Sequence, residues 1–199
     1  MSMAIKPFIR RSSQSGFALL LTLLVVSVLI AIGLTVLDLS IKQIRLSTNA
    51  KESESAFHAA NAGVECARYW RRIASTTMET GGSITPTCFS VASTDSRLAV
   101  IDPTDISGDG NAYLYKYSLS WGTKPRCTKI STLVIVASPT GTGLTLRNVQ
   151  NYIQGYPENT AKACTAGERC TILSTRGYNR TCSTVSGYGS VEREVLLQF

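Results

Sequence analysis

One apolar run constrains this chain more than any other feature. The 21 residues from Phe17 to Leu37 carry no charged side chain, and their only hydroxyl groups belong to Thr22, Ser27 and Thr35. An α-helix rises about 1.5 Å per residue, so about 20 apolar residues cross the ~30 Å hydrocarbon layer of a bilayer. A cleaved secretory signal has a shorter apolar region, of about 7–15 residues, followed by a small-residue cleavage site that this sequence lacks. The run therefore predicts a transmembrane helix.

The charges on either side of this run indicate how the helix is inserted. Lys6, Arg10 and Arg11 precede the run, whereas charges of both signs follow it between Asp38 and Arg45. Lys and Arg are enriched on the cytoplasmic side of transmembrane helices. We therefore expect a single-pass protein of the inner (cytoplasmic) membrane, with its N-terminus in the cytoplasm and the bulk of the chain outside.

The helical pattern continues beyond the apolar run. No proline interrupts the chain before Arg72, and apolar residues recur at three- and four-residue steps that mark one face of a helix. These residues are Leu37, Ile41, Ile44, Phe57, Ala60, Val64 and Ala67. We predict one continuous helix from Phe17 to about Ser75, about 88 Å long. It is apolar on all sides over residues 17–38 and amphipathic over residues 39–75. Gly63 costs about 1 kcal/mol relative to Ala and permits a local bend.

Two short stretches resemble one family of bacterial proteins. "QSGF" joins a short basic leader to the apolar helix, and "AFHAANAGVECARYW" spans Ala56–Trp70. The first is similar to the leader junction of a type IV prepilin. The second is similar to the A-F-x-A-A-x-A-G-x-E stretch of pilus-assembly minor pilins and related pilin-like proteins. The resemblance implies that residues 1–16 are a leader, that a prepilin peptidase cuts between Gly16 and Phe17, and that Phe17 becomes the N-methylated terminus.

Two positions depart from the family's pattern. Most pilins carry Glu as the fifth residue of the mature chain, where this chain has Leu21. Many major pilins carry Pro near the outer end of the apolar half, where this chain has Asp38. A missing acid is familiar in certain minor and tip-located subunits, so the sequence leaves open whether the chain is a major, minor or tip subunit.

The resemblance also implies a function. We expect a structural, minor or tip subunit of a type IV pilus-like extracellular filament (fimbrium), assembled by packing of its N-terminal helix. The expected partners are other pilin subunits, the prepilin peptidase, the pilus or secretion assembly machinery and the membrane. On the apolar run alone, the alternative is an uncleaved single-pass membrane protein with an extracytoplasmic binding domain.

The remaining residues, 76–199, predict a β-rich head. Alternating or β-branched side chains indicate four strands. They span Ala112–Trp121, Thr128–Ser138, Cys170–Asn179 and Ser190–Phe199. The expected fold class is α+β, with an antiparallel sheet packed on the amphipathic half of the helix in the manner of a pilin. Phe57, Val64 and Tyr69 are expected to contact the core.

Six cysteines follow the apolar run, and no two of them have the CxxC spacing that zinc ribbons and thioredoxin-like sites use. Three disulfides in an oxidising compartment are the favoured interpretation, and buried free thiols are the alternative. Six cysteines allow 15 pairings. Proximity along the chain suggests Cys66–Cys88 and Cys164–Cys170, which leaves Cys127–Cys182.

One stretch partly matches a calcium loop. Asp105, Ser107, Asp109 and Gly110 follow the start of the D-x-[DN]-x-[DN]-G pattern, but Ser107 replaces a preferred ligand. The twelfth position, where the full loop has a bidentate Glu, is Lys116. Asp105, Ser107 and Asp109 are therefore a weak Ca²⁺ candidate, and a plain Asp/Gly turn is favoured.

Nothing in the sequence predicts an enzyme or a specific nucleic-acid binder. His58 is the only histidine and lies beside Phe57 in the predicted helix, where a structural or solvent-facing role is expected. The net charge is +7 and falls to +4 without Lys6, Arg10 and Arg11, and the remaining cations form no dense stripe. The mechanism expected from the sequence is assembly, without catalysis.

Overall fold

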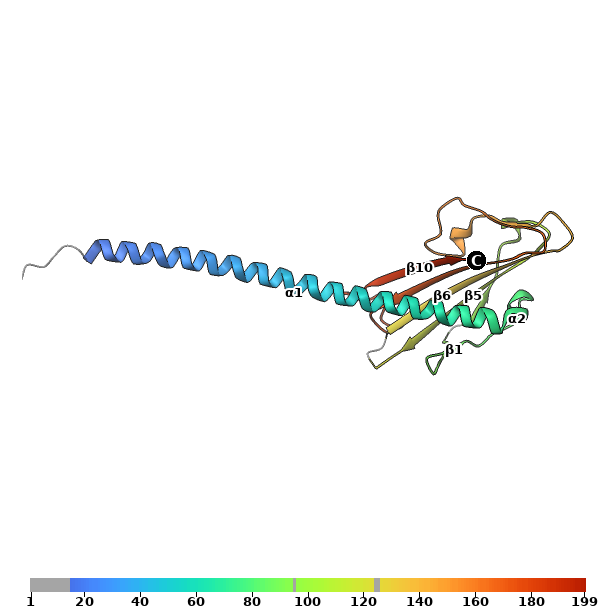
Figure 1. The fold of residues 1–199 in the computed structure, drawn as a ribbon, viewed down its shortest axis with the longest axis horizontal. Helices are drawn as coiled ribbons and strands as arrows, with labels where there is room; N and C mark the ends of the chain where they lie inside the picture. The colour runs from blue at the N-terminus through green and yellow to red at the C-terminus, as the bar shows by residue number, and fades with distance from the viewer. Residues whose placement is uncertain (1–14, 95, 124–125) are drawn as a thin grey trace, which may run out of the picture. The chain divides into compact units, whose positions relative to one another are not determined.

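A computed structural model describes residues 15–94, 96–123 and 126–199. The long helix α1 spans Ser15–Ile73, and the short helix α2, Ser75–Glu79, follows it (Figure 1). The chain divides into two compact units, of which the first ends at Asn49 and the second comprises Ala50–Phe199. The predicted long helix is therefore present, and it begins two residues before Phe17.

The second unit contains a five-stranded antiparallel sheet in the order β10-β9-β6-β5-β3. Its strands are β3 (Arg97–Ala99), β5 (Gly110–Trp121), β6 (Arg126–Ala137), β9 (Arg169–Tyr178) and β10 (Glu192–Gln198). The four longest strands are the four that the sequence predicts, within two residues at each end. The α+β fold class and its antiparallel sheet are therefore confirmed.

The smaller elements were not predicted. A three-stranded antiparallel sheet has the order β4-β7-β8, and a hairpin pairs β1 with β2. The strands are β1 (Thr87–Cys88), β2 (Val91–Ala92), β4 (Ile106–Gly108), β7 (Leu144–Leu146) and β8 (Lys162–Cys164). Two 3-10 turns, η1 (Pro103–Asp105) and η2 (Val149–Asn151), lie between them. Strands of two or three residues are too short to show a repeat of period two.

The two faces of the five-stranded sheet have different cores. Residues of one parity in β5, such as Tyr117 and Leu119, pack with Val64 of α1. Leu114, of the opposite parity, packs with β7 residues such as Leu144. Successive side chains of a strand point to opposite faces. Helix α1 therefore covers one face, and the three-stranded sheet covers part of the other.

Small residues form the face of α1 that packs on the sheet. The buried residues of this face are Ala56, Ala59, Ala60, Gly63, Val64 and Ala67. Val64 is buried as expected, but the expectation that Phe57 and Tyr69 reach the core is wrong, because they are 47% and 58% exposed. The close approach of helix and sheet leaves room only for small side chains, so the large ones point away.

Candidate functional site

The described part of the first unit is a helix whose apolar side chains are all exposed. Every residue from Gly16 to Ala50 is exposed, and the helix is long and apolar enough to cross a membrane. Within this stretch the Thr22, Ser27 and Thr35 hydroxyls each donate to the carbonyl oxygen three residues earlier, at 2.8 Å. Since hydrocarbon offers no hydrogen-bond partner, these bonds suit the polar groups to an apolar environment.

The predicted leader junction lies at the start of this helix. Gly16 and Phe17 belong to α1, and the Phe17 side chain is 74% exposed. Leu21 lies one turn further along and is 51% exposed. The rest of the predicted leader, residues 1–14, lies outside the described residues. Leader cleavage and methylation of Phe17 therefore stay predictions.

Two glycines set how closely α1 approaches the sheet. A Cβ at Gly177 in β9 would overlap the backbone of Ala56 and Ala60, and a Cβ at Gly63 would overlap the Thr128 methyl group. Glycine inside a strand often marks such a close backbone approach. Gly177 is a functional position that the sequence pattern could have indicated, because a glycine inside a predicted strand is a signal of close backbone approach.

Two threonines of the sheet hold the helix by its backbone. The Thr128 hydroxyl donates to the Ala59 carbonyl oxygen at 2.9 Å, and the Thr175 hydroxyl donates to the Ala60 carbonyl oxygen at 3.0 Å. Both threonines are fully buried. A buried hydroxyl needs a partner, and these two find it across the helix–sheet interface. The sequence offered no signal for these bonds.

Three disulfides brace the second unit, and they join the same pairs that proximity along the chain suggested. Cys66–Cys88 joins α1 to β1, Cys127–Cys182 joins the start of β6 to the segment after β9, and Cys164–Cys170 joins β8 to β9. Disulfides form and persist in oxidising compartments. They are therefore a hint that this unit lies outside the cytoplasm.

The candidate calcium ligands lie in a different arrangement from a calcium loop. Ser107 belongs to β4 and pairs with Thr145 of β7. Both carboxylate oxygens of Asp105 accept hydrogen bonds, from Asn148 at 2.8 Å and from the Tyr152 hydroxyl at 2.6 Å. Burial, together with this bond to Asp105, raises the pKa of Tyr152. A cation would have to displace these partners, so we propose no calcium site.

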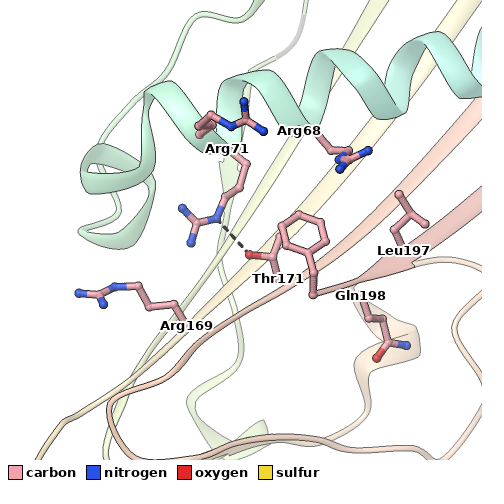
Figure 2. Close-up of a pocket in the computed structure, with 8 residues that line it drawn as sticks. Arg68, Arg71, Arg169, Thr171, Leu197 and Gln198 are labelled. Atoms are coloured by element: carbon pink, nitrogen blue, oxygen red, sulfur yellow. Dashed lines mark hydrogen bonds between the residues drawn. The ribbon is translucent and has the colours of Figure 1, made fainter.

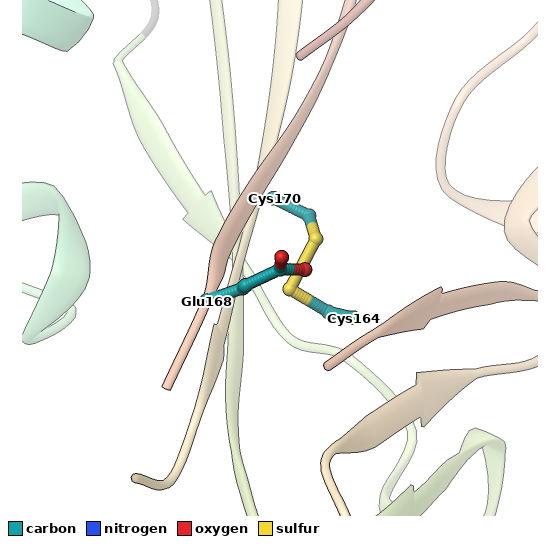
Figure 3. A group of neighbouring side chains, drawn as sticks. All are labelled: Cys164, Glu168 and Cys170. Atoms are coloured by element: carbon teal, nitrogen blue, oxygen red, sulfur yellow. A yellow bond between two sulfur atoms is a disulfide. The ribbon is translucent and has the colours of Figure 1, made fainter. Parts of the chain in front are cut away.

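A second group of metal-ligand residue types is also unsuited to a metal. Cys164, Glu168 and Cys170 gather at the turn between β8 and β9 (Figure 3). The two cysteines form a disulfide with each other. Only a thiolate binds a metal ion well, so the oxidised pair leaves Glu168 as a lone carboxylate.

A pocket of about 570 Å³ lies between the end of α1 and the strands β9 and β10. Its lining residues are Arg68, Arg71, Arg72, Arg169, Thr171, Leu197, Gln198 and Phe199. The Arg71 side chain, 11% exposed, donates to the Thr171 hydroxyl at 3.0 Å (Figure 2) and to Glu79 at 2.8 Å. Arg169 pairs with the other oxygen of Glu79. Glu79 thus neutralises two of the arginines, and the cluster joins α1 and α2 to β9.

The only histidine has the solvent-facing position expected from the sequence. The His58 side chain is 62% exposed, and its Nε2 atom lies 3.6 Å from a carboxylate oxygen of Glu54. Both residues lie on α1 one turn apart. Among the described residues, Glu54 is the acidic neighbour of this imidazole, and no nucleophile is hydrogen-bonded to it.

The fold and these sites define an α+β protein with one helix that can span a membrane and a second unit braced by disulfides. No protein-family model, curated protein or solved structure matches the chain.

Proposed function

We propose that this chain is a type IV pilin-like subunit whose N-terminal helix moves from the membrane into the core of a filament. The observation that carries the proposal is the exposure of the apolar stretch of α1 on all of its sides. Soluble proteins rarely expose apolar patches of more than a few hundred Å². This stretch therefore needs lipid or other apolar helices around it.

A helix of this kind has two low-energy environments, the bilayer and a dry bundle of similar helices. Transfer from lipid into such a bundle exchanges one apolar environment for another, so packing and small residues decide the balance. Ala31 and Gly33 allow a close approach on this helix. Its three hydroxyls already have partners within the helix, so they suit both environments.

The proposed location follows from the charges and the disulfides. Before assembly, the chain spans the cytoplasmic membrane with its N-terminus inside, and after assembly it belongs to an extracellular filament. Its partners are a prepilin peptidase, other pilin subunits and the assembly machinery. Leu21, where most pilins carry Glu, favours a minor or tip subunit over the bulk subunit. This role requires helix packing and no catalytic group.

The first experiment measures the intact mass and the N-terminal residue of the chain expressed with and without an active matching prepilin peptidase. We expect an N-methylated Phe17 terminus only with the peptidase. A chain that still begins at Met1 in the presence of the active peptidase contradicts the proposal. It would leave the alternative, a permanent single-pass membrane protein.

Two matched glycine variants localise the cut. A Cβ at Gly16 or at Gly33 meets no other atom within 4 Å, and leucine is a good helix former, so Gly16→Leu and Gly33→Leu should both leave the helix intact. We expect Gly16→Leu to abolish the Phe17 terminus, because a bulky side chain then occupies the cleavage position. The chain with Gly33→Leu is processed normally. Equal processing of both variants would place the cut elsewhere.

A further inference from the structure

The face of the five-stranded sheet opposite α1 is only partly covered by the three-stranded sheet. Beyond that cover lies a hollow of about 360 Å³, here called the basic hollow. Four cations and two hydroxyl side chains give it its character: Arg97, Lys116, Lys129, Arg176, Ser118 and Ser131. None of the described residues that line it is acidic.

The strand register places the cations of the basic hollow directly beside one another. Arg97 of β3 is paired with Lys116 of β5, and Lys129 of β6 is paired with Arg176 of β9. Like charges on directly opposed residues destabilise a sheet. Arg176 is compensated by Glu192 at 3.5 Å and stands opposite Glu194 of β10 in the register. Lys116 and Lys129, by contrast, have no acidic residue opposite them in the register. These two lysines are therefore the positions at which the open face can bind negative charge.

The same chain carries an acidic counterpart at one end of the sheet. Asp109 and Glu168 are both exposed. Their backbone carbonyl oxygens accept from Ser138 at 2.9 Å and from Ala137 at 3.1 Å, so they flank the end of β6 on its two sides. Adjacent strands lie about 4.8 Å apart, which separates these acids by about 10 Å. We call them the acidic rim.

The two surfaces cannot meet within one molecule. Asp109 immediately precedes β5 and Lys116 lies seven residues further along, and a strand rises about 3.4 Å per residue, which separates them by about 24 Å. Lys129 and Glu168 are similarly far apart, because Lys129 pairs with Arg176 near the other end of β9. Any salt bridge between the basic hollow and the acidic rim therefore joins two copies of the chain.

We propose that the basic hollow of one copy binds the acidic rim of the next copy. The two surfaces differ, so the contact is head-to-tail, and such contacts build rings or open-ended filaments rather than closed pairs. This inference rests on the proposed assembly of the chain and names a contact between the outer units of neighbouring subunits. A nucleic acid is the less suitable occupant. Single-stranded nucleic acids stack bases on exposed aromatic rings. Among the described residues, the rings of Tyr117, which lines the hollow, and of Tyr178, which lies beside Lys129, are both buried.

The test is zero-length cross-linking of the full-length protein. Equal amounts of ¹⁴N- and ¹⁵N-labelled chains are mixed in detergent micelles and treated with a carbodiimide, which joins a lysine to a carboxylate only when the two are in contact. We expect mixed-isotope peptides that join Lys116 or Lys129 to Asp109 or Glu168. Their yield should fall at least tenfold between 0.05 and 1 M NaCl, because salt shortens the screening length from above 10 Å to about 3 Å.

Charge-exchange variants provide the controls. Because Lys→Glu removes the amine that the carbodiimide needs, association of the variants is followed by sedimentation velocity in detergent. The double variant Lys116→Glu with Lys129→Glu should lose the association, and adding Asp109→Lys with Glu168→Lys should restore it. Lys51→Glu, a single charge reversal on the exposed face of α1, should leave the association unchanged. Correct disulfide pairing in each variant, determined by non-reducing peptide mapping, ensures that a loss of association is not a loss of folding.

The outcomes separate this contact from the proposed function. If Phe17 becomes the terminus but no mixed-isotope peptide joins these four residues, the inference is overturned and the proposed function stands. If the peptides form while the chain still begins at Met1, the contact stands and the proposed function falls. If replacing the hollow lysines by glutamate fails to reduce the association seen by sedimentation, the contact is not electrostatic and the inference is overturned. If an acidic polysaccharide such as heparin protects the hollow lysines from acetylation while no chain-to-chain link forms, the hollow binds another polyanion.

Discussion

A methyl group at Gly177 tests the close packing of α1 on the sheet. In Gly177→Ala, the new Cβ overlaps backbone atoms of Ala56 and Ala60, which cannot move aside by changing rotamer. The helix must rise from β9 by about 1 Å or more. Overpacking of this kind costs about 1–3 kcal/mol. The rise also breaks the Thr128 and Thr175 hydrogen bonds to the helix, at about 1 kcal/mol each.

The expected total is a loss of about 3–5 kcal/mol in the free energy of unfolding of the second unit. That is a large part of the 5–15 kcal/mol typical of a domain. It lowers the melting temperature by about 10 °C for a unit of this size. The assay follows the near-ultraviolet circular dichroism of the full-length protein in detergent during heating, since the tyrosine and tryptophan side chains lie mainly in this unit.

The matched control is the same substitution where nothing opposes it. In Gly33→Ala, no atom lies within 4 Å of the new Cβ, and alanine favours a helix, so the melting temperature should not fall. If Gly177→Ala also melts within about 2 °C of the unaltered protein, with all three disulfides intact, the helix does not lie as close to β9 as the structure places it.

Three further predictions concern stability. Burial raises the pKa of Tyr117 above its ordinary value of about 10, so the unfolded chain loses this proton first. The contribution of Tyr117 to the free energy of unfolding is therefore fully present below about pH 10. Above that pH it falls by up to about 1.4 kcal/mol per pH unit. The variant Tyr117→Phe should make the unfolding midpoint depend less on pH between about pH 9 and 11.5. The double variant Cys66→Ser with Cys88→Ser removes a disulfide between residues 22 positions apart. It should lower the free energy of unfolding, measured in urea, by about 3 kcal/mol. An unchanged free energy of unfolding would mean that this disulfide does not form. Glu79→Gln leaves the largely buried Arg71 without its compensating charge and should cost about 1–3 kcal/mol in the same assay, whereas a neutral result would show that this ion pair contributes nothing.

The long elements were predictable because their patterns repeat many times. The apolar run of α1 exceeds 20 residues, and β5 alternates over its whole length, so each pattern is sampled often enough to identify the element. The interface between them was harder to predict. The apolar repeat of the helix predicts Phe57 in the core, but the buried face of α1 is set by how near the sheet comes. That distance depends on Gly177, more than 100 residues away in the sequence.

Among the candidate sites too, some features were predictable from the sequence and others were not. The cysteine pairs followed from proximity along the chain, because two of the three bridges join neighbours in the sequence. The hollow cations could not be grouped in advance, since Arg97, Lys116, Lys129 and Arg176 come from four strands and only the register brings them together. Composition gave a net charge but no location for it.

The alternation of β5 explains why those cations lie on an open face. Tyr113, Tyr115 and Tyr117 occupy one parity of this strand, where Tyr117 packs on α1 and the other two pack around Met78 of α2, so Lys116 must occupy the other face. A shift of one residue in the strand pairing would turn Lys116 toward the core and the tyrosines toward the open face. The loss of the buried aromatic contacts would strongly destabilise that pairing. Burial of the aromatic residues therefore fixes the basic surface. A variant that keeps the tyrosines but replaces the lysine should change association between copies without changing the fold.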